Sequence, residues 1–278
     1  MQITHKAVET TTRRNWLRTT AQTATGLLAG TWAGSALMAD SRIAARIDDA
    51  PSEHPLVPAL RMAARSRDRL TAIEDYEATF VKSELIGRRL TSSRMQLKLR
   101  EKPFSVYLKF LEPHAGREVL YVANRNAGKL LVHEVGLASL VGSISLDPNG
   151  KLAMDESRYP LTMLGMRTLV DTVMQQWLGE TRLDNISVNY FPKARVGELH
   201  CKVIESSHAA RRPETQFQMT RLYLDADSGL PIRVQQYGFP ARQGDRAPLI
   251  EDYLYLNLET NVGLTDADFD PANARYGF

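Results

Sequence analysis

The sequence predicts an α+β protein, mainly antiparallel, built around one strongly curved sheet or incomplete β-barrel whose concave face is covered by helices. Three observations predict it. From Asp75 onward, short segments alternate apolar and polar residues, which is the period of a strand with one buried face. Short turns join these segments, without the helical crossovers of a parallel sheet. Only two segments have helical periodicity, so few helices are available to cover the sheet.

One predicted helix precedes the strands and the other divides them into two sets. Residues 56–73 place several apolar side chains near one face and leave most of their arginines outside. This arginine run is either a partner site or, in the simpler interpretation, a solvated helix face. Residues 161–178 are broadly apolar, which predicts a helix that packs on the sheet.

Four or five strands are expected before the second helix and five after it. Met95, Leu97 and Leu99 alternate with polar neighbours, the pattern of a half-buried strand. Residues 136–150 are rich in Gly and Ser and are ambiguous. The expected strands are 76–82, 95–100, 104–111, 118–123, 129–135, 186–191, 198–205, 216–224, 232–239 and 250–258.

A curved sheet with two helices leaves room for an apolar pocket between the two layers, a usual place for a small-molecule site. Two strands and the second helix supply the side chains expected to line it. Some of these residues could equally be filled core. The candidate ligand-binding residues are Met95, Leu97, Leu99, Val106, Leu108, Phe110, Leu164, Met174 and Trp177.

Arg117 is a candidate latch. It follows His114 and Gly116, where one strand passes to the next, and it is expected at the rim of the sheet. There its guanidinium group would bind a carbonyl of a covering lid or a ligand headgroup. The alternative interpretation is an exposed arginine at a strand end.

The first 39 residues predict a cleaved signal peptide. Arg13 and Arg14 precede a stretch from Thr19 to Ala39 that has no charge but is too rich in Thr and Gly for a membrane span. The paired arginines resemble the twin-arginine export motif, with general secretion or an uncleaved anchor as alternatives. Cys201 is the only cysteine, so a lipid-modified cysteine at the cleavage site is excluded.

Removing this segment leaves a chain with balanced charge. Residues 1–39 hold four of the 35 basic and one of the 32 acidic residues, so 31 of each remain. The overall charge therefore gives no indication of nucleic-acid binding. Residues 40–54 are expected to form a flexible lead-in and residues 55–278 a single domain in the periplasm, stabilised by burial rather than by a disulfide.

Motifs for catalysis, metals and cofactors are lacking in the sequence. It contains no His-Glu-x-x-His, Gly-x-Ser-x-Gly, Gly-x-Gly-x-x-Gly or Walker loop. His200 and Cys201 are adjacent on a predicted strand and point to opposite faces, so they are unsuited to sharing a metal ion. Glu251 and Asp252 also point to opposite faces of a predicted strand, so we do not expect them to form an acid–base pair. We expect no enzyme activity, no metal and no cofactor.

Four segments carry a family resemblance. In chain order they are YEATFVKSELIGRRL, PFSVYLKFLEPHAGREVLYV, RLYLDADSGLPIRVQQYGFP and LTDADFDPANARYGF. Together they resemble the bacterial family DUF1571, a domain of unknown function, over about Leu56 to Phe278. That family belongs with the wider LolA/LolB-like group of envelope lipoprotein carriers. The resemblance implies a LolA-like incomplete barrel, helices across its opening and a site for acyl chains, without catalytic residues.

Three functional hypotheses follow. The first is a non-enzymatic periplasmic binding protein that holds the acyl chains of a lipid or lipoprotein and makes transient membrane contact. The second is an envelope sensor or scaffold that binds a protein partner with the same fold. The third is an uncharacterised hydrolase. A bound lipid, a stable protein complex, or turnover that one His or Asp substitution abolishes would distinguish the three.

Overall fold

The structure is a computed structural model, which describes residues 46–47, 50–51, 53–137, 142–242 and 244–278. These residues belong to one compact unit, Ala44–Phe278. The predicted signal peptide at 1–39, including Arg13 and Arg14, lies outside the described residues, as does most of the predicted lead-in at 40–54. No helix in the described ranges combines the length and the apolar character that crossing a membrane requires.

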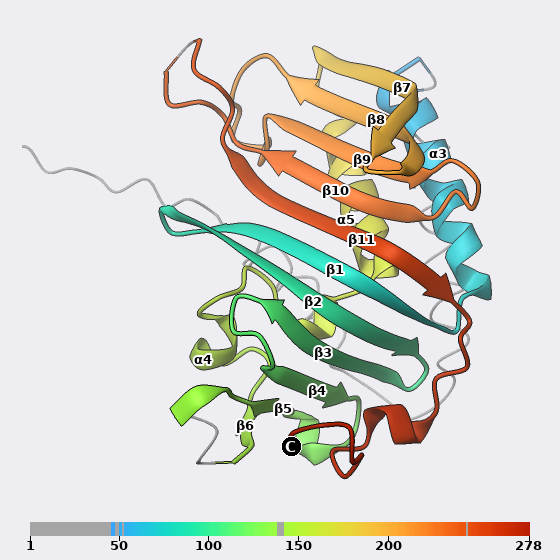
Figure 1. The fold of residues 1–278 in the computed structure, drawn as a ribbon. Coiled ribbons are helices and arrows are strands. Elements are labelled where there is room, and N and C mark those ends of the chain that lie inside the picture. Colours follow the sequence, from blue (N-terminus) through green and yellow to red (C-terminus); the bar gives the residue numbers. More distant parts are fainter. Residues whose placement is uncertain (1–45, 48–49, 52, 138–141, 243) are drawn as a thin grey trace, which may run out of the picture. The chain divides into compact units, whose positions relative to one another are not determined.

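The core of the unit is a single sheet of eleven strands in the order β6-β5-β4-β3-β2-β1-β11-β10-β9-β8-β7 (Figure 1). Every pair of neighbours is antiparallel. Two meanders therefore meet where β1 pairs with β11, and the sheet stays open because β6 and β7 are both edges. The fold-class prediction of an open, mainly antiparallel sheet with few helices is confirmed.

The strands follow the alternation in the sequence closely. The first meander contains β1 (Asp75–Ile86), β2 (Arg89–Glu101), β3 (Phe104–Glu112), β4 (Glu118–Val122), β5 (Leu130–His133) and β6 (Ile144–Leu146). The second contains β7 (Ile186–Val196), β8 (Leu199–His208), β9 (Met219–Asp225), β10 (Pro231–Tyr237) and β11 (Leu249–Thr260). The short strand β6 lies in the segment that the sequence left ambiguous.

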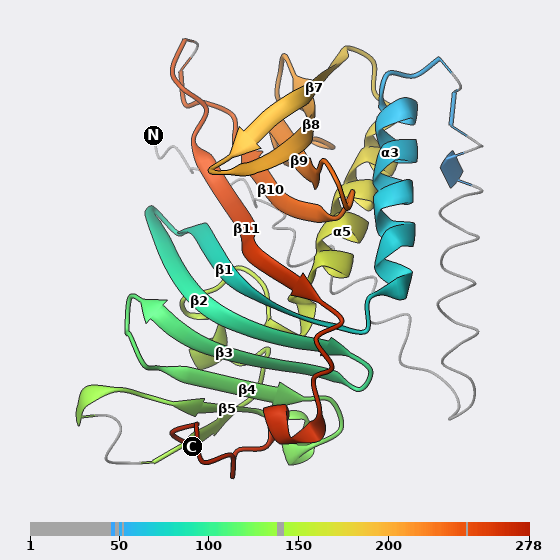
Figure 2. The ribbon, with the colours of Figure 1, turned by 45° about the vertical axis from the view of Figure 1, so that its right-hand side comes forward.

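Two long helices cover one face of the second meander. Helix α3 (Leu56–Arg69) packs beside α5 (Met166–Glu180), and α5 lies on β10 while α3 reaches β7 (Figure 2). Helix α3 buries its apolar residues and continues into a 3-10 turn, Leu70–Ala72. We call the covered face the helix-side face of the sheet. A shorter helix, α4 (Lys151–Met154), lies in the connection between the meanders.

The second helix begins later than the sequence predicted. Residues Leu161–Met163 form a 3-10 turn after Pro160, and α5 starts only at Met166. Between them, Gly165 has φ 128°, a conformation that side-chain-bearing residues rarely adopt. A Cβ at this glycine would lie 3.3 Å from Leu99, so the chain approaches the sheet closely here. Leu164 therefore precedes the covering helix and is not part of it.

The chain's last segment covers the opposite face of the first meander. Phe269, in the 3-10 turn Asp266–Phe269, packs with Tyr107, Leu120 and Val122. The ring of Tyr276 stacks on Tyr107 with 4.1 Å between centroids. The C-terminal segment thus buries apolar side chains on the face of β3 and β4 that points away from the helices.

Candidate functional site

The two predicted triplets lie side by side on the helix-side face. Strand pairing sets Met95 opposite Phe110, Leu97 opposite Leu108, and Leu99 opposite Val106. Directly paired residues of antiparallel strands share a face. Five of the six are at most 5% exposed, and Phe110 is partly exposed. The structure therefore builds one continuous apolar surface from β2 and β3, as the alternation predicted.

Trp177 and Met174 lie over the other half of the sheet. Trp177 is fully buried, and its Nε1 donates to Ser206 Oγ on β8 at 2.9 Å. The preceding residue, Gln176, accepts from Gln236 Nε2 of β10 at 2.7 Å and donates to Thr220 Oγ1 of β9 at 3.0 Å. These bonds fix α5 on the second meander. The nine predicted ligand-binding residues thus form two groups rather than the lining of a single surface.

The segment that connects the two halves crosses the helix-side face along β1. We call residues 156–165 the strap. Near its start, Lys82 Nζ of β1 donates to Ser157 Oγ at 2.7 Å. At its end, the backbone N–H of Met166 donates to the hydroxyl of Tyr76, at the other end of β1, at 3.2 Å. The strap therefore runs opposite to β1 over the middle of the sheet.

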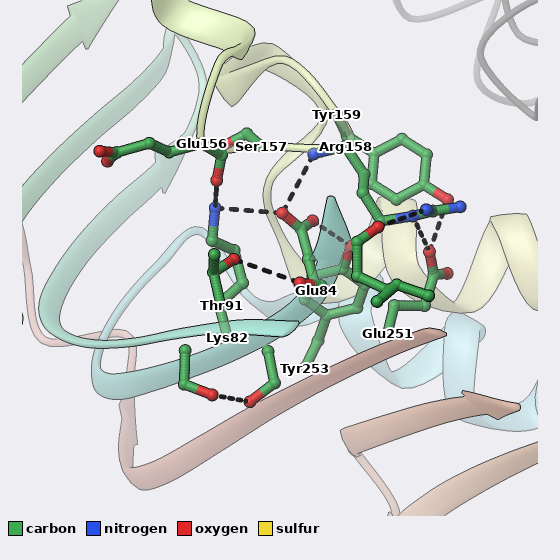
Figure 3. A network of polar contacts seen from close by, with 12 residues as sticks. Lys82, Glu84, Thr91, Glu156, Ser157, Arg158, Tyr159, Glu251 and Tyr253 are labelled. Carbon is green, nitrogen blue, oxygen red and sulfur yellow. Dashed lines mark hydrogen bonds and ion pairs between the residues drawn. The ribbon is translucent and has the colours of Figure 1, made fainter. Parts of the chain in front are cut away.

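A buried polar network holds the start of the strap (Figure 3). Arg158 and Tyr159 both donate to Oε2 of Glu251, at 3.1 Å from Nε and 2.8 Å from the hydroxyl. Glu251 comes from β11 and is 0% exposed. Two adjacent residues of the strap thus bind one carboxylate, which lies near the start of the central strand β11.

A second buried carboxylate lies beside the first. Glu84 of β1 pairs directly with Glu251 and is 1% exposed. Its Oε2 accepts from the backbone N–H of Arg158 at 3.0 Å and lies 3.3 Å from Lys82 Nζ. The hydroxyl of Tyr253 donates to Oε1. Strands β1 and β11 and the strap, far apart in sequence, therefore meet at this pair.

The network balances its charges. Two carboxylates face the cations Lys82 and Arg158, which is the condition under which buried charges are tolerated. Burial, followed by Glu251 and Glu84, raises the pKa of Tyr253 well above its usual value, so its hydroxyl remains a donor. Burial opposes the charge of Arg158, but Glu251, Tyr159 and Tyr253 together outweigh it and raise the pKa of the guanidinium group. With its acceptors occupied by these donors, the network is suited to positioning the strap.

Arg117 also contacts the connection between the meanders. Its Nε donates to Glu134 and its Nη1 to Glu156 of the strap, each at 2.9 Å. The guanidinium group lies over the ring of Phe110, 5.4 Å from its centroid. The partners of Arg117 are thus two carboxylates, whereas the sequence interpretation named a carbonyl or a ligand headgroup.

Sequence reasoning missed the polar network because each member looks ordinary alone. A signal was present in β1, where inward positions change from Tyr76, Ala78 and Phe80 to Lys82 and Glu84. Polar residues that continue an inward apolar series indicate a buried polar site. The sequence does not indicate that β11, which supplies Glu251, is the strand that pairs with β1. Within the described part of the chain, no group of three or more His, Cys, Asp or Glu side chains is placed to hold a metal ion.

Several solved structures are similar to this chain. A DUF1329 family protein from Desulfovibrio piger is 17% identical, with 78% of this chain and 97% of that chain covered and a TM-score of 0.37. The lipoprotein LppX of Mycobacterium tuberculosis is 11% identical, with 77% of this chain and 99% of that chain covered and a TM-score of 0.43. A chain of the MucA/MucB complex of Pseudomonas aeruginosa is 16% identical, with 77% of this chain and 60% of that chain covered and a TM-score of 0.44.

No curated protein sequence matches this chain. The family described as "Protein of unknown function (DUF1571)" matches residues 73–278, well over half of the sequence and all eleven strands. The resemblance carried by the four quoted segments is thereby confirmed, and the chain belongs to the DUF1571 family.

Proposed function

We propose that this protein is a non-enzymatic binding protein that holds an acyl chain of a lipid or lipoprotein against the helix-side face of β1–β3, beneath the strap. The location we propose is the periplasm, reached through the predicted signal peptide at 1–39, with residues 55–278 acting as one domain. The reaction class is reversible binding, without a cofactor or a metal. Arg117 is proposed to tether the strap through Glu156.

The proposed function rests on how the strap is held: polar contacts fix its two ends, and the segment between them is irregular. Specific polar contacts hold its two ends, at Glu84 and Glu251 and at Tyr76. Between them, Leu161, Met163 and Leu164 are only partly buried and lie outside α5. An irregular cover of this kind has fewer backbone hydrogen bonds than a helix and opens at lower cost.

An acyl chain could replace the strap's contacts with the apolar surface. The surface beneath includes Leu97, Leu99 and Val106, each at most 1% exposed while the strap is in place. Burial of an acyl chain supplies about 0.8 kcal/mol per methylene, from which the costs of association and of opening the strap are subtracted. A chain of about 16 carbons therefore supplies on the order of 10 kcal/mol before these costs.

The exposed edge of the sheet favours the second candidate, a scaffold for a protein partner. Strand β7 is an edge strand, and its Tyr190 and Phe191 are 42% and 46% exposed. An edge strand offers unpaired backbone groups to an added strand. A stable complex with an envelope protein, together with no lipid binding, would favour this candidate over the carrier.

Titration with a fluorescent fatty acid tests the carrier function. Leu164→Asn places an amide against the proposed chain, and we expect about a tenfold to hundredfold loss of affinity. Leu258→Asn is the matched control, because Leu258 packs in an apolar cluster around Val203 and Ile232, away from the strap. Melting temperatures of both variants should be compared with that of the wild type.

Native ligand is sought by mass spectrometry of organic extracts from protein purified out of its own envelope. A co-purifying lipid supports the carrier. The proposal fails if the wild-type protein binds neither fatty acid nor lipopeptide. It also fails if Leu164→Asn and Leu258→Asn weaken binding equally, because the strap would then have no special role.

A further inference from the structure

Three connections at one end of the sheet carry a concentration of arginines. They are the β1–β2 turn, the β8–β9 connection and the β10–β11 connection. Glu84, near the end of β1, pairs with Glu251, near the start of β11, and Ser207, near the end of β8, pairs with Met219 at the start of β9. Because β10 lies between β11 and β9 and is antiparallel to both, all three connections lie at the same end of six consecutive strands. We call the arginines of these connections, together with Arg89 at the start of β2, the basic rim: Arg88, Arg89, Arg211, Arg212, Arg242 and Arg246.

All six side chains of the basic rim belong to exposed residues. Across the ranges that the structure describes, none of their guanidinium groups has a carboxylate within ion-pair distance. Other arginines of this protein are paired, such as Arg221 with Glu205 and Arg233 with Asp252. The rim arginines thus differ from Arg221 and Arg233, whose charges neighbouring carboxylates neutralise.

The rim is locally basic in a chain that is otherwise balanced. The three connections contain two acids, Glu214 and Asp245, against five arginines, and Arg89 adjoins the β1–β2 turn as the sixth. Residues 40–278 as a whole hold equal numbers of acidic and basic residues, because 31 of each remain after residues 1–39 are set aside. The excess of positive charge in these connections is therefore balanced by acids elsewhere in residues 40–278.

Two of the three connections contact each other. Arg211 of the β8–β9 connection lies over the ring of Phe239 in the β10–β11 connection, with 5.3 Å between the guanidinium carbon and the centroid. The β1–β2 turn and the β10–β11 connection project from the same side of the sheet in Figure 1. Leu90, beside Arg89, adds an apolar side chain that is 49% exposed.

We propose that the basic rim docks this protein onto the anionic phospholipid headgroups of a membrane surface. The planar fork of a guanidinium group matches the oxygens of a phosphate, and six such groups without acidic partners offer many simultaneous contacts. The strap begins at the same end of the sheet, since Arg158 donates to the carbonyl of Leu85, directly before the β1–β2 turn. Docking would therefore bring the start of the strap to the lipid surface.

Cosedimentation of the full chain with lipid vesicles tests this surface. The vesicles contain phosphatidylcholine with about one third phosphatidylglycerol, and pure phosphatidylcholine vesicles serve as the uncharged reference. The rim variant and a control variant each lose four positive charges and keep the same N-terminal segment. The rim variant is Arg88→Gln, Arg89→Gln, Arg242→Gln and Arg246→Gln; the control is Arg61→Gln, Arg65→Gln, Lys193→Gln and Lys202→Gln, all exposed in the structure.

The rim variant should bind the anionic vesicles at least about a hundredfold more weakly than the wild type, since each arginine near an anionic surface contributes about fivefold. The control should stay within about threefold, and replacing the four rim arginines with lysine should restore most of the binding. Binding should weaken as salt is raised. Circular dichroism and melting establish that all variants are folded.

Equal loss in the rim and control variants would overturn the proposal, because net charge alone would then explain binding. Equal wild-type binding to both vesicle types would overturn it as well. Binding of an acidic protein but of no anionic vesicle would assign the rim to a protein partner instead. Fatty-acid titration of the rim variant separates this proposal from the carrier function, since the rim variant should retain normal fatty-acid affinity.

Discussion

Substituting Glu251 by Gln tests whether the buried network positions the strap. Glu251 is 0% exposed and accepts from both Arg158 and Tyr159. Gln keeps the shape and one oxygen acceptor, but it leaves Arg158 short of one counter-charge. Breaking a buried ion pair in this way costs about 3–5 kcal/mol. Since Arg158 stays partly accessible to solvent and near Glu84, we expect the lower end, about 3 kcal/mol.

Asp252→Asn is the matched control because Asp252 is the next residue and points to the opposite face. Its carboxylate pairs with Arg233 at 2.5 Å, with the two side chains 14% and 21% exposed. Solvent screens this pair, and we expect a loss of about 1 kcal/mol. Urea unfolding measures both losses, with an unchanged m-value indicating that the denatured state is unaffected.

A double-mutant cycle with Arg158→Met isolates the interaction itself. If the network acts as a unit, Glu251→Gln should cost far less in the Arg158→Met background, with a coupling energy of about 2 kcal/mol. Hydrogen exchange of the strap in Glu251→Gln should rise before exchange in β1 or β11 does. A coupling below about 0.5 kcal/mol, or equal losses in Glu251→Gln and Asp252→Asn, would refute the reasoning.

Three further predictions concern other parts of the chain. Partial burial opposes ionisation of Asp268, but hydrogen bonds from Lys98 and Thr265 lower its pKa to about 2, below the unfolded value of about 3.9. The stabilisation from ionised Asp268 is therefore present above about pH 4 and lost as the pH falls toward 2. Asp268→Asn should reduce the pH dependence of the unfolding free energy in this window by up to about 1 kcal/mol after solvent screening, and an unchanged dependence contradicts this. Burial raises the pKa of the Cys201 thiol, so a thiol reagent should react at least about a hundredfold more slowly with native than with unfolded protein, and equal rates would show that the site is open. Replacing Arg13 and Arg14 with Lys should leave precursor in the cytoplasm, whereas normal mature protein in the periplasm would indicate general secretion.

Most strands were predictable because their patterns are local. Met95, Leu97 and Leu99 alternate with polar residues, and the structure places all three inward on β2. The first strand was predicted as 76–82 but continues to Ile86. The missing residues include Glu84, which follows Lys82 in the inward series at a position where an apolar side chain is the usual signal. The pattern failed there because polar bonds satisfy those positions in place of apolar packing.

Strand order and the short edge strand were beyond the reach of local pattern. The pairing of β1 with β11 joins segments that are far apart in the sequence, and the residue pattern of neither segment identifies its partner strand. Strand β6 has only three residues and gains its definition from pairing with β5. The start of α5 was missed because Leu164 fits the apolar periodicity, while the backbone of Gly165 turns away from the helix to approach Leu99.

The network's position also bears on why charges are buried in this sheet at all. Well-packed apolar residues at Glu84, Glu251 and Arg158 would serve stability as well as or better than an ion-pair network, because desolvation offsets much of the attraction. A charged set nevertheless does what an apolar set does not: it accepts only one register of the strap, since a shift by one residue would bury Arg158 without its carboxylates. It is also weakened by solvent, so water or headgroups that reach the end of the sheet lower the cost of releasing the strap. In the carrier function that we propose, these two properties would let the strap return to one closed position after each opening, and release of the strap would begin at the end of the sheet where the basic rim lies.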